Sequence, residues 1–388
     1  MEKIKIGDVC DILNGYAFKS ENYVDSGIRI IRITNVQKGY IEDTSPVFYP
    51  LNATGLDRYR LVKNDLLISL TGNVGRVALL DESLLPAALN QRVACLRLKT
   101  DKVTKKYLYH ILNSDFFERQ CIQAAKGVAQ KNMSTEWLKD YEIPLCAKEE
   151  QEKIIKVLDC VQRIIVNYKQ ELQKLGELVK SRFIEMFGIP GTDAFGWGLV
   201  PLGIVCSINP KKSHDQRLVS GAEVSFVPMP AVTERGEIDA TAIKEYDEVK
   251  TGFTYFAEND VLFAKITPCM ENGKGAVAKG LHNGIGFGST EFHVLRPISG
   301  KTDPSWIYAL TAFSQFRMDA VSNMTGSAGQ RRVPASFLEN YRVSLPPIAL
   351  QEQFAAFVEQ VDKSKFAIQQ ALNKSQLLFD SLMQKYFE

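Results

Sequence analysis

A long run with coiled-coil spacing constrains this chain more than any other feature of its sequence. From about Glu149 to Phe187 the apolar residues recur in alternating steps of four and three, which is the spacing of a coiled-coil seam. Arg182 is the only break in this seam. The seam positions are Ile154, Leu158, Val161, Ile165, Tyr168, Leu172, Leu175, Val179 and Met186. We therefore expect one long helix whose seam packs against a partner helix.

The C-terminus carries a second seam at a constant offset of 200 residues. Its positions are Phe354, Val358, Val361, Lys365, Ile368, Leu372, Ser375, Phe379, Leu382 and Tyr386. Because the two seams share one phase, they predict two long helices that pair with each other. Lys365 and Ser375 weaken the second seam. Two unrelated surface helices would leave the shared phase unexplained.

The segments that precede the two helices also echo each other. Lys5–Cys10 returns as Pro201–Cys206, Lys63–Leu67 as Glu258–Leu262, Cys95–Arg97 as Val294–Arg296, and Gln151–Glu152 as Gln351–Glu352. An internal repeat of about 200 residues is too long for a solenoid unit and indicates a duplicated module. The echoes fade between these framework segments, so the two copies are expected to share a fold and to differ in their loops.

Within the first copy, short strands and one helix are predicted. Gly27–Thr34 alternates apolar with polar residues, and Val93–Leu98 is a β-like run, so each predicts a strand. Leu61–Leu70 contains a further predicted strand near an Asn-Asp turn. Tyr107–Gln123 has helical spacing. This mixture predicts an α+β fold, with two similar domains that are each followed by a long helix.

The repeat predicts four segments along the chain. They are a first domain (1–148), a central helix (149–189), a second domain (190–346) and a C-terminal helix (347–388). Because the ends of a domain usually lie close together, the second helix is expected to double back along the first. The two helices would then form an antiparallel coiled coil with a pseudo-two-fold relation between the halves.

Two related but different domains in inverted orientation suit duplex DNA as a ligand. Dyad-related modules reach half-sites that are separated by about one helical turn or more, roughly 34–36 Å. Since the loops of the two domains differ, the two half-sites should differ in sequence.

Charge and cysteine content narrow the class of protein. The net charge is +2, and residues 1–148 hold 21 basic against 17 acidic residues, an excess of +4. This is less than a free-standing DNA-binding domain carries, so any DNA role needs local patches or partners that add positive charge. Seven scattered cysteines without a Cys-x-x-Cys pair favour reduced thiols in the cytoplasm. The sequence shows neither a secretion signal nor an apolar stretch long enough to cross a membrane.

An enzyme is disfavoured because no catalytic motif is found. The sequence has no phosphate-binding Gly-x-x-x-x-Gly-Lys motif and no His-Glu-x-x-His zinc motif. Asn209-Pro210-Lys211 begins like an adenine-methyltransferase motif but departs from it at the third position. The four histidines lack the spacing of metal ligands, and we predict no metal site.

Several polar loops are candidates for DNA contact. Thr71–Arg76 is a Gly-x-x-Gly-Arg turn that either approaches a phosphate or simply joins two strands, and Glu271–Gly275 again places a base beside glycines. Asn90–Arg92 groups residue types that read adenine and guanine edges, although a solvated turn is equally plausible. Gln130–Asn132 and Gln330–Arg332 recur at equivalent places in glycine loops, which favours phosphate or base contact.

The complete set of candidate DNA-binding residues follows these loops and nearby basic or polar positions. It comprises Lys19, Arg32, Asn35, Lys38, Thr71, Asn73, Arg76, Asn90, Gln91, Arg92, Lys126, Gln130, Lys131, Asn132, Lys211, Lys212, Lys265, Lys274, Thr290, Gln330, Arg331 and Arg332. The aromatic residues Tyr16, Phe18, Phe116 and Trp137 are interpreted as core side chains and not as stacking platforms.

Over its whole length the sequence resembles the specificity subunits of type I restriction–modification systems. The most specific matching segments are Ile143–Leu145 with Glu150–Ile154, and their second copy Leu345–Phe354. The Thr71–Arg76 loop and the Gly-x-x-Gln-[Lys/Arg] loops also resemble this family. Cys146-Ala147 and Leu350 depart from the usual residues of these segments, and the second glycine loop is irregular.

The resemblance implies a role in recognising DNA. Each domain would be a target-recognition domain that reads one half of a bipartite, asymmetric site in double-stranded DNA, and the coiled coil would set the gap. Two modification subunits would methylate adenine with S-adenosylmethionine, and two restriction subunits can add ATP- and Mg-dependent translocation and cleavage. The chain itself would bind none of these cofactors. The competing hypothesis is a coiled-coil adaptor with two lobes that bind ligands other than DNA.

Overall fold

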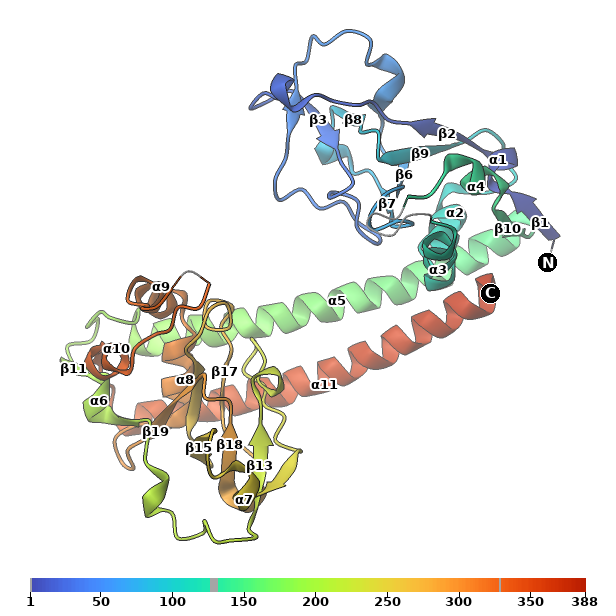
Figure 1. Cartoon of the computed structure of the whole chain (residues 1–388). Helices are drawn as coiled ribbons and strands as arrows, with labels where there is room; N and C mark the ends of the chain where they lie inside the picture. Colours follow the sequence, from blue (N-terminus) through green and yellow to red (C-terminus); the bar gives the residue numbers. More distant parts are fainter. Residues whose placement is uncertain (1, 126–131, 328) are drawn as a thin grey trace. The chain divides into compact units, whose positions relative to one another are not determined.

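The two predicted seams lie on two long helices of equal length, α5 (Lys148–Phe187) and α11 (Ile348–Phe387). The structure is a computed structural model that describes residues 2–125, 132–327 and 329–388. The chain divides into two units, residues 1–169 with 370–388 (unit 1) and residues 170–369 (unit 2). Each unit therefore takes half of each long helix together with one α+β domain (Figure 1).

The two helices pack together in antiparallel fashion within each unit. In unit 1 the start of α5 and the end of α11 share a core that contains Leu158 and Met383. In unit 2 the ring of Phe354, near the start of α11, lies 5.6 Å from Phe183 and 5.4 Å from Phe187 at the end of α5. Every predicted seam position on both helices is buried or half-buried. The prediction of a paired seam is thus confirmed.

The described residues of unit 1 form two four-stranded sheets and one strand pair. The first sheet has the order β2-β9-β6-β7 and the second β4-β3-β8-β5, while β1 pairs with β10. The strands are β1 (Glu2–Lys5), β2 (Cys10–Asn14), β3 (Ile28–Ile31), β4 (Phe48–Tyr49), β5 (Arg60–Leu61), β6 (Leu66–Ser69), β7 (Val77–Leu79), β8 (Ala87–Leu89), β9 (Val93–Leu98) and β10 (Glu142–Leu145). The helices are α1 (Ile6–Val9), α2 (Lys105–Leu112), α3 (Asp115–Ala124) and α4 (Thr135–Asp140).

Unit 2 repeats this plan. Its sheets have the orders β12-β19-β16-β17 and β14-β13-β18-β15, and β11 pairs with β20. The strands are β11 (Leu199–Pro201), β12 (Cys206–Ile208), β13 (Glu223–Val227), β14 (Ile243–Glu245), β15 (Thr254–Ala257), β16 (Val261–Ala264), β17 (Gly275–Val277), β18 (Ile285–Gly288), β19 (Phe292–Pro297) and β20 (Arg342–Ser344). The helices are α6 (Leu202–Val205), α7 (Tyr246–Val249), α8 (Pro304–Ala312), α9 (Ser314–Ser322) and α10 (Ala335–Asn340). The matching strand orders confirm the duplicated α+β module.

The predicted helix over Tyr107–Gln123 is wrong in one respect, because the segment forms two helices. Helix α2 ends at Leu112 and α3 begins at Asp115. Between them, the Ser114 hydroxyl accepts a hydrogen bond of 3.1 Å from the Phe117 N–H, which is the geometry of a helix N-cap. The break turns the buried side chains of both helices onto the first sheet, where Tyr107 and Phe117 are fully buried.

A buried glutamine ties each long helix to its own domain. The Gln351 side chain is 0% exposed. Its oxygen accepts from the Asp303 N–H at 2.9 Å, and its nitrogen donates to the carbonyls of Lys301 (3.0 Å) and Pro346 (2.8 Å). In unit 1, Gln151 makes the corresponding bonds to Thr104, Lys102 and Cys146. The echoed glutamines therefore fix the point at which each helix leaves its domain.

Replacing Gln351 by leucine should lower the free energy of unfolding of unit 2 by about 2–4 kcal/mol. One buried backbone group, the Pro346 carbonyl, and two part-buried ones lose their partners, and leaving a buried polar group unpaired costs about 1–3 kcal/mol. Urea denaturation, with hydrogen exchange of the unit 2 amides, measures the change. The exposed Gln353, two residues along the same helix, is the matched control, and Gln353→Leu should change the free energy by less than about 0.5 kcal/mol. Equal effects of the two variants would contradict this prediction.

Candidate nucleic-acid interface

In unit 1, four separate segments meet at the ends of strands β6 and β8. The Leu70 N–H donates to the Arg92 carbonyl at 3.0 Å, and the Met133 N–H donates to the Leu70 carbonyl at 2.8 Å. The Gln91 N–H donates to the Tyr16 carbonyl at 2.9 Å. We call residues 16, 70–76, 89–92 and 132–133 the loop cluster of unit 1. It brings together the Thr71–Arg76 loop, the Asn90–Arg92 turn and Asn132, which the sequence predicted as separate candidates.

The loop of residues 70–76 joins the antiparallel strands β6 and β7. The Ser69 hydroxyl holds it by accepting from the Arg76 N–H at 3.0 Å. Gly75 has a φ of +82°, and a side chain there would lie 2.7 Å from the Cys121 Cβ, so α3 packs directly against the loop. Gly72 and Asn73 are exposed. The loop is therefore a hairpin connection that is anchored at Ser69 and Gly75 and presents its middle to solvent.

The turn between β8 and β9 presents polar side chains beside this loop. Gln91 and Arg92 are exposed and Asn90 is half-buried. The Asn90 carbonyl accepts from the Val93 N–H at 2.9 Å, which closes the turn. Across the cluster, the Thr71 hydroxyl lies 3.0 Å from the Asn132 side-chain oxygen. Among the residues that the structure describes in unit 1, no acid forms an ion pair with Arg92.

The same backbone scheme recurs in unit 2 with different side chains. The Lys265 N–H donates to the Glu291 carbonyl and the Val333 N–H donates to the Lys265 carbonyl, both at 2.9 Å. Lys265 thus stands where unit 1 has Leu70, and Glu291 stands where it has Arg92. Arg332 replaces Asn132, since each forms a bridge with the second residue after the strand end, Ile266 after β16 and Thr71 after β6. We call residues 265–275, 288–291 and 329–333 the loop cluster of unit 2.

An ion pair occupies the centre of the unit 2 cluster. The Arg332 guanidinium donates from Nε and Nη2 to the Glu291 carboxylate at 3.0 and 2.7 Å, which lowers the pKa of Glu291 below its usual value. Arg331 lies 3.5 Å from the Glu271 carboxylate. Thr290 and Gln330 are exposed, and the Lys274 ammonium lies 3.4 Å from the Met229 carbonyl. One frame therefore carries arginines and amides in unit 1 and two lysines, two arginines and two acids in unit 2.

The remaining candidates lie elsewhere or outside the described residues. Asn35 is buried and bonds the Arg32 N–H and the Glu42 carbonyl, so its amide holds a turn. Lys38 pairs with Asp115 and Glu118 on α3. Arg32 donates to the Ser45 carbonyl, Lys212 donates to the Lys250 carbonyl, Lys19 lies near Glu21, and Lys211 is exposed. Arg76, at the end of the loop cluster of unit 1, donates to the Gln37 side chain. Lys126, Gln130 and Lys131 lie outside the described residues.

The sequence alone does not indicate two features of the loop clusters. Tyr16 is not a core residue, because 38% of its surface is exposed and its backbone is bonded to the Asn90–Arg92 turn. Glu291 is recognisable as part of the loop cluster of unit 2 only from the strand register, which makes it equivalent to Arg92. The Gly15-Tyr16 pair was visible in the sequence, but only the structure shows which loop it meets.

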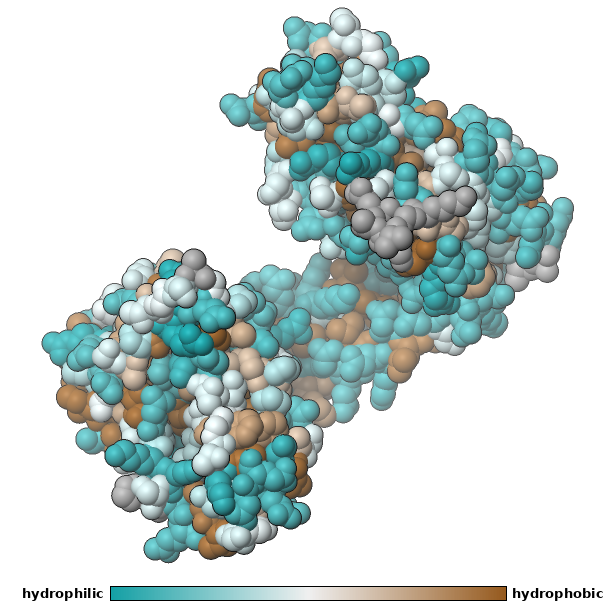
Figure 2. Space-filling view, in the orientation of Figure 1, coloured by the Kyte–Doolittle hydropathy of each residue, from teal (hydrophilic) through white to brown (hydrophobic). Residues whose placement is uncertain are grey.

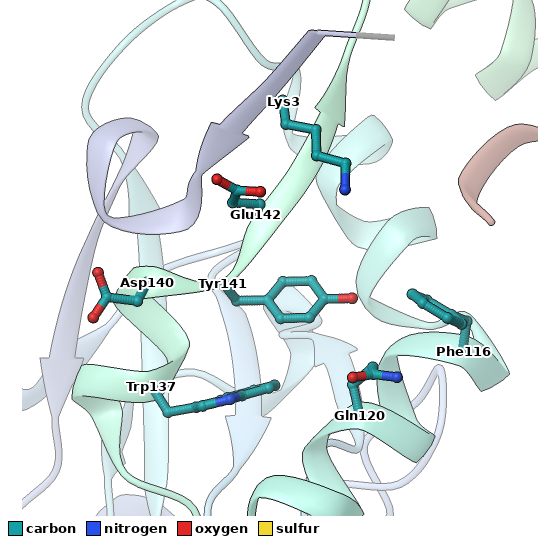
Figure 3. Close-up of a pocket in the computed structure, with 7 residues that line it drawn as sticks. All are labelled: Lys3, Phe116, Gln120, Trp137, Asp140, Tyr141 and Glu142. Carbon is teal, nitrogen blue, oxygen red and sulfur yellow. The ribbon is translucent and has the colours of Figure 1, made fainter.

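A hollow of about 380 Å³ lies between α3, α4 and the β1–β10 pair. In Figure 3 the Tyr141 ring projects into it, with Trp137 on one side and Lys3 on the other. Unit 2 has an equivalent hollow of about 650 Å³ lined by Phe337 and Tyr341. Both hollows are lined by polar and aromatic side chains, and in unit 2 the Tyr341 hydroxyl donates to the Asp319 carboxylate at 3.2 Å.

The described parts of the chain restrict two further possibilities. Residues 2–125, 132–327 and 329–388 contain no group of three or more histidine, cysteine or acidic side chains placed to hold a metal ion. None of the helices in these ranges is both long and apolar enough to cross a membrane. On the face that Figure 2 presents, both units are mainly hydrophilic with scattered apolar patches.

Similarity to known proteins agrees with this architecture. The profile described as "Type I restriction modification DNA specificity domain" matches residues 1–177 and 196–376. The specificity subunit of the Escherichia coli type I restriction enzyme EcoEI is 41% identical over 190 residues, which cover 46% of this chain and 30% of that subunit. The specificity subunit of the E. coli enzyme EcoAI is 38% identical over 195 residues, covering 48% and 32%. The matched part therefore spans about a third of these relatives.

A solved structure shares the fold over the whole chain. The S subunit of a type I restriction–modification system from M. genitalium covers 100% of this chain and 96% of its own, with a TM-score of 0.56 and 15% identity. At this level of identity the similarity concerns the fold alone.

Proposed function

The chain belongs to the family of type I restriction–modification DNA specificity domains, and from this premise we propose that it is the subunit that recognises DNA for such a system. In this proposal each unit reads one half of a bipartite site through its loop cluster. The bound DNA directs two methyltransferase subunits to the adenines of the site, and two restriction subunits join for cleavage. The chain acts in the cytoplasm and has no catalytic site of its own.

One observation carries the proposal most strongly, namely that the two loop clusters share a backbone frame and differ in their side chains. In unit 1 the frame consists of the backbone hydrogen bonds from Leu70 to Arg92 and from Met133 to Leu70. In unit 2, Lys265 makes the corresponding backbone hydrogen bonds with Glu291 and Val333. Base edges are distinguished by donor and acceptor patterns, so a fixed frame with exchanged side chains reads different bases. An asymmetric bipartite site needs two such readers.

The division of chemistry among subunits is part of the same proposal. S-adenosylmethionine, ATP and Mg would be held by the partner subunits. The modest basic excess of residues 1–148, 21 basic against 17 acidic, is consistent with partners that contribute to DNA affinity. A two-lobed adaptor for other ligands, the competing hypothesis, predicts no sequence-dependent DNA binding by the assembled complex.

Arg92→Ala should weaken binding of the assembled methyltransferase complex to its duplex site by about tenfold. The guanidinium is exposed and is suited to a guanine edge or a phosphate, and one such contact contributes about 1–3 kcal/mol. Fluorescence anisotropy at several salt concentrations measures the affinity and separates the two contacts, because loss of a phosphate contact also reduces the salt slope.

The control for this experiment is a lysine on the long helix. Lys156→Ala removes one exposed positive charge from unit 1, on α5 and outside the loop cluster. It should leave the affinity within about twofold of the wild type. If Arg92→Ala bound the site as tightly as Lys156→Ala at moderate salt, the contact would be refuted.

A further inference from the structure

Tyr16, which is 38% exposed, belongs to the loop cluster of unit 1 through its backbone. Strand β2 ends at Asn14, and the chain then runs parallel to the turn after β8. The Tyr16 N–H donates to the Leu89 carbonyl at 2.8 Å, and the Tyr16 carbonyl accepts from the Gln91 N–H at 2.9 Å. These two bonds fix the Tyr16 backbone beside Gln91 and Arg92, both of which are exposed.

Glycine at position 15 makes this close approach possible. A side chain at Gly15 would lie 2.2 Å from the Asn90 carbonyl oxygen and 2.5 Å from that of Leu89. Any other residue would therefore push the two segments apart and move Tyr16 away from the turn. The sequence Gly15-Tyr16 thus positions an aromatic ring at the turn with little freedom.

The ring itself is held by two other aromatic side chains. Phe18 lies edge-on with its centroid 5.0 Å from that of Tyr16, and the Tyr59 centroid lies at 5.2 Å. Phe18 in turn contacts Tyr49 at 4.9 Å. Because Phe18 and Tyr59 already restrict the ring, Tyr16 loses little conformational entropy when a ligand covers its exposed part.

Unit 2 lacks a counterpart at this place. The strand registers equate Ile12 with Ile208, because Cys10 pairs with Leu98 and Cys206 pairs with Pro297. Strand β12 ends at Ile208, two residues short of the corresponding end of β2. Asn209 then adopts a φ of +51° and the chain turns into Lys211. The aromatic ring is therefore a feature of one reader and not of the shared frame.

We propose that Tyr16 contacts a base pair in the DNA half-site that unit 1 reads, next to the bases reached by Gln91 and Arg92. The inference rests on the proposed function and names a specificity-determining residue within it. An uncharged aromatic ring with one hydroxyl suits an apolar base edge such as the thymine methyl group, with the hydroxyl available to a neighbouring donor or acceptor. A contact of this kind discriminates between bases without neutralising a phosphate.

The test uses the complex assembled from this chain and the methyltransferase subunits with which it is produced. Its methylated site is mapped first, and duplexes with every single base-pair change in the unit 1 half-site serve as probes. Tyr16→Ala should lose about 5- to 100-fold of discrimination at one or two positions and keep the wild-type salt slope. Tyr16→Phe separates the two parts of the side chain: retained discrimination assigns the contact to the ring, and partial loss assigns it to the hydroxyl as well.

Phe253 of unit 2 provides the matched control. It is also 38% exposed and lies edge-on to another aromatic ring, Phe226, at 5.1 Å. Phe253→Ala should leave discrimination in the unit 1 half-site unchanged. Tyr16→Ala with full discrimination at every position, or with an equal loss on all duplexes, would overturn the proposal for Tyr16 alone. A wild-type complex that binds all duplexes equally would instead overturn the proposed function.

Discussion

Replacing Asp260 by alanine should lower the free energy of unfolding of unit 2 by about 3 kcal/mol. Asp260 is 1% exposed and accepts from Nε and Nη2 of Arg296 at 2.7 and 2.6 Å, a bidentate pair that raises the pKa of Arg296. It also accepts from the Ala257 N–H at 2.7 Å. The variant leaves a half-buried guanidinium without its acid and a turn N–H without its acceptor, and breaking such a pair costs about 3–5 kcal/mol when both partners are buried. Arg296 is 32% exposed on its side chain, which places the effect at the lower end.

Denaturant unfolding followed by hydrogen exchange of the unit 2 amides checks this expectation. Glu234→Ala, which removes an exposed acid in the same unit, should change the free energy by less than about 0.5 kcal/mol. The double variant Asp260→Leu with Arg296→Leu should recover part of the loss, because the unpaired charge is then removed as well. If Asp260→Ala lowers the free energy of unfolding by less than about 1 kcal/mol, solvent replaces the carboxylate as the partner of the Arg296 guanidinium.

The Asp260–Arg296 pair shows how far the sequence could predict the fold. The echoes of Asn64-Asp65 in Asn259-Asp260, and of Arg97 in Arg296, were visible as two separate similarities. The structure shows that they are one interaction, since Asp65 also binds Arg97, at 3.0 and 2.6 Å. Periodicity and repetition record which positions are equivalent, but not which of them meet across a sheet.

The loop clusters show the same limit. Seam positions could be predicted because burial on a helix follows a short period in the sequence. By contrast, Leu70, Arg92 and Met133 come together only through strand register and one bridge between loops. The break at Ser114 was missed because the apolar spacing of α2 and α3 continues across it, although serine is a preferred N-cap residue. The exposure of Tyr16 cannot be predicted either, because aromatic composition does not reveal which ring is covered.

The paired helices lead to the prediction with the largest functional effect. Inserting one heptad into α5 after Lys169 and one into α11 after Gln369 should shift methylation to sites whose half-sites are farther apart. Seven residues preserve the phase of the seam and lengthen each helix by about 10 Å, or up to about three base pairs of DNA at roughly 3.4 Å each. If the helices set the gap, the variant meets only one half-site of the native target. Methylation there should then fall by more than about 100-fold, because several mismatched base pairs cost about 1–3 kcal/mol each.

Mapping of methylated adenines in cells that produce the variant complex measures the shift. The matched control inserts two residues at the same two places, which rotates the apolar positions beyond each insertion by about 200° and should abolish methylation at both spacings. Heptad insertion into α5 alone should do the same, because the seams of the two helices then no longer match. Methylation of the native site by the double-heptad variant at the wild-type rate would show that the gap is set by something other than helix length. The seam of Ile154 to Met186 would then serve only to hold each unit together.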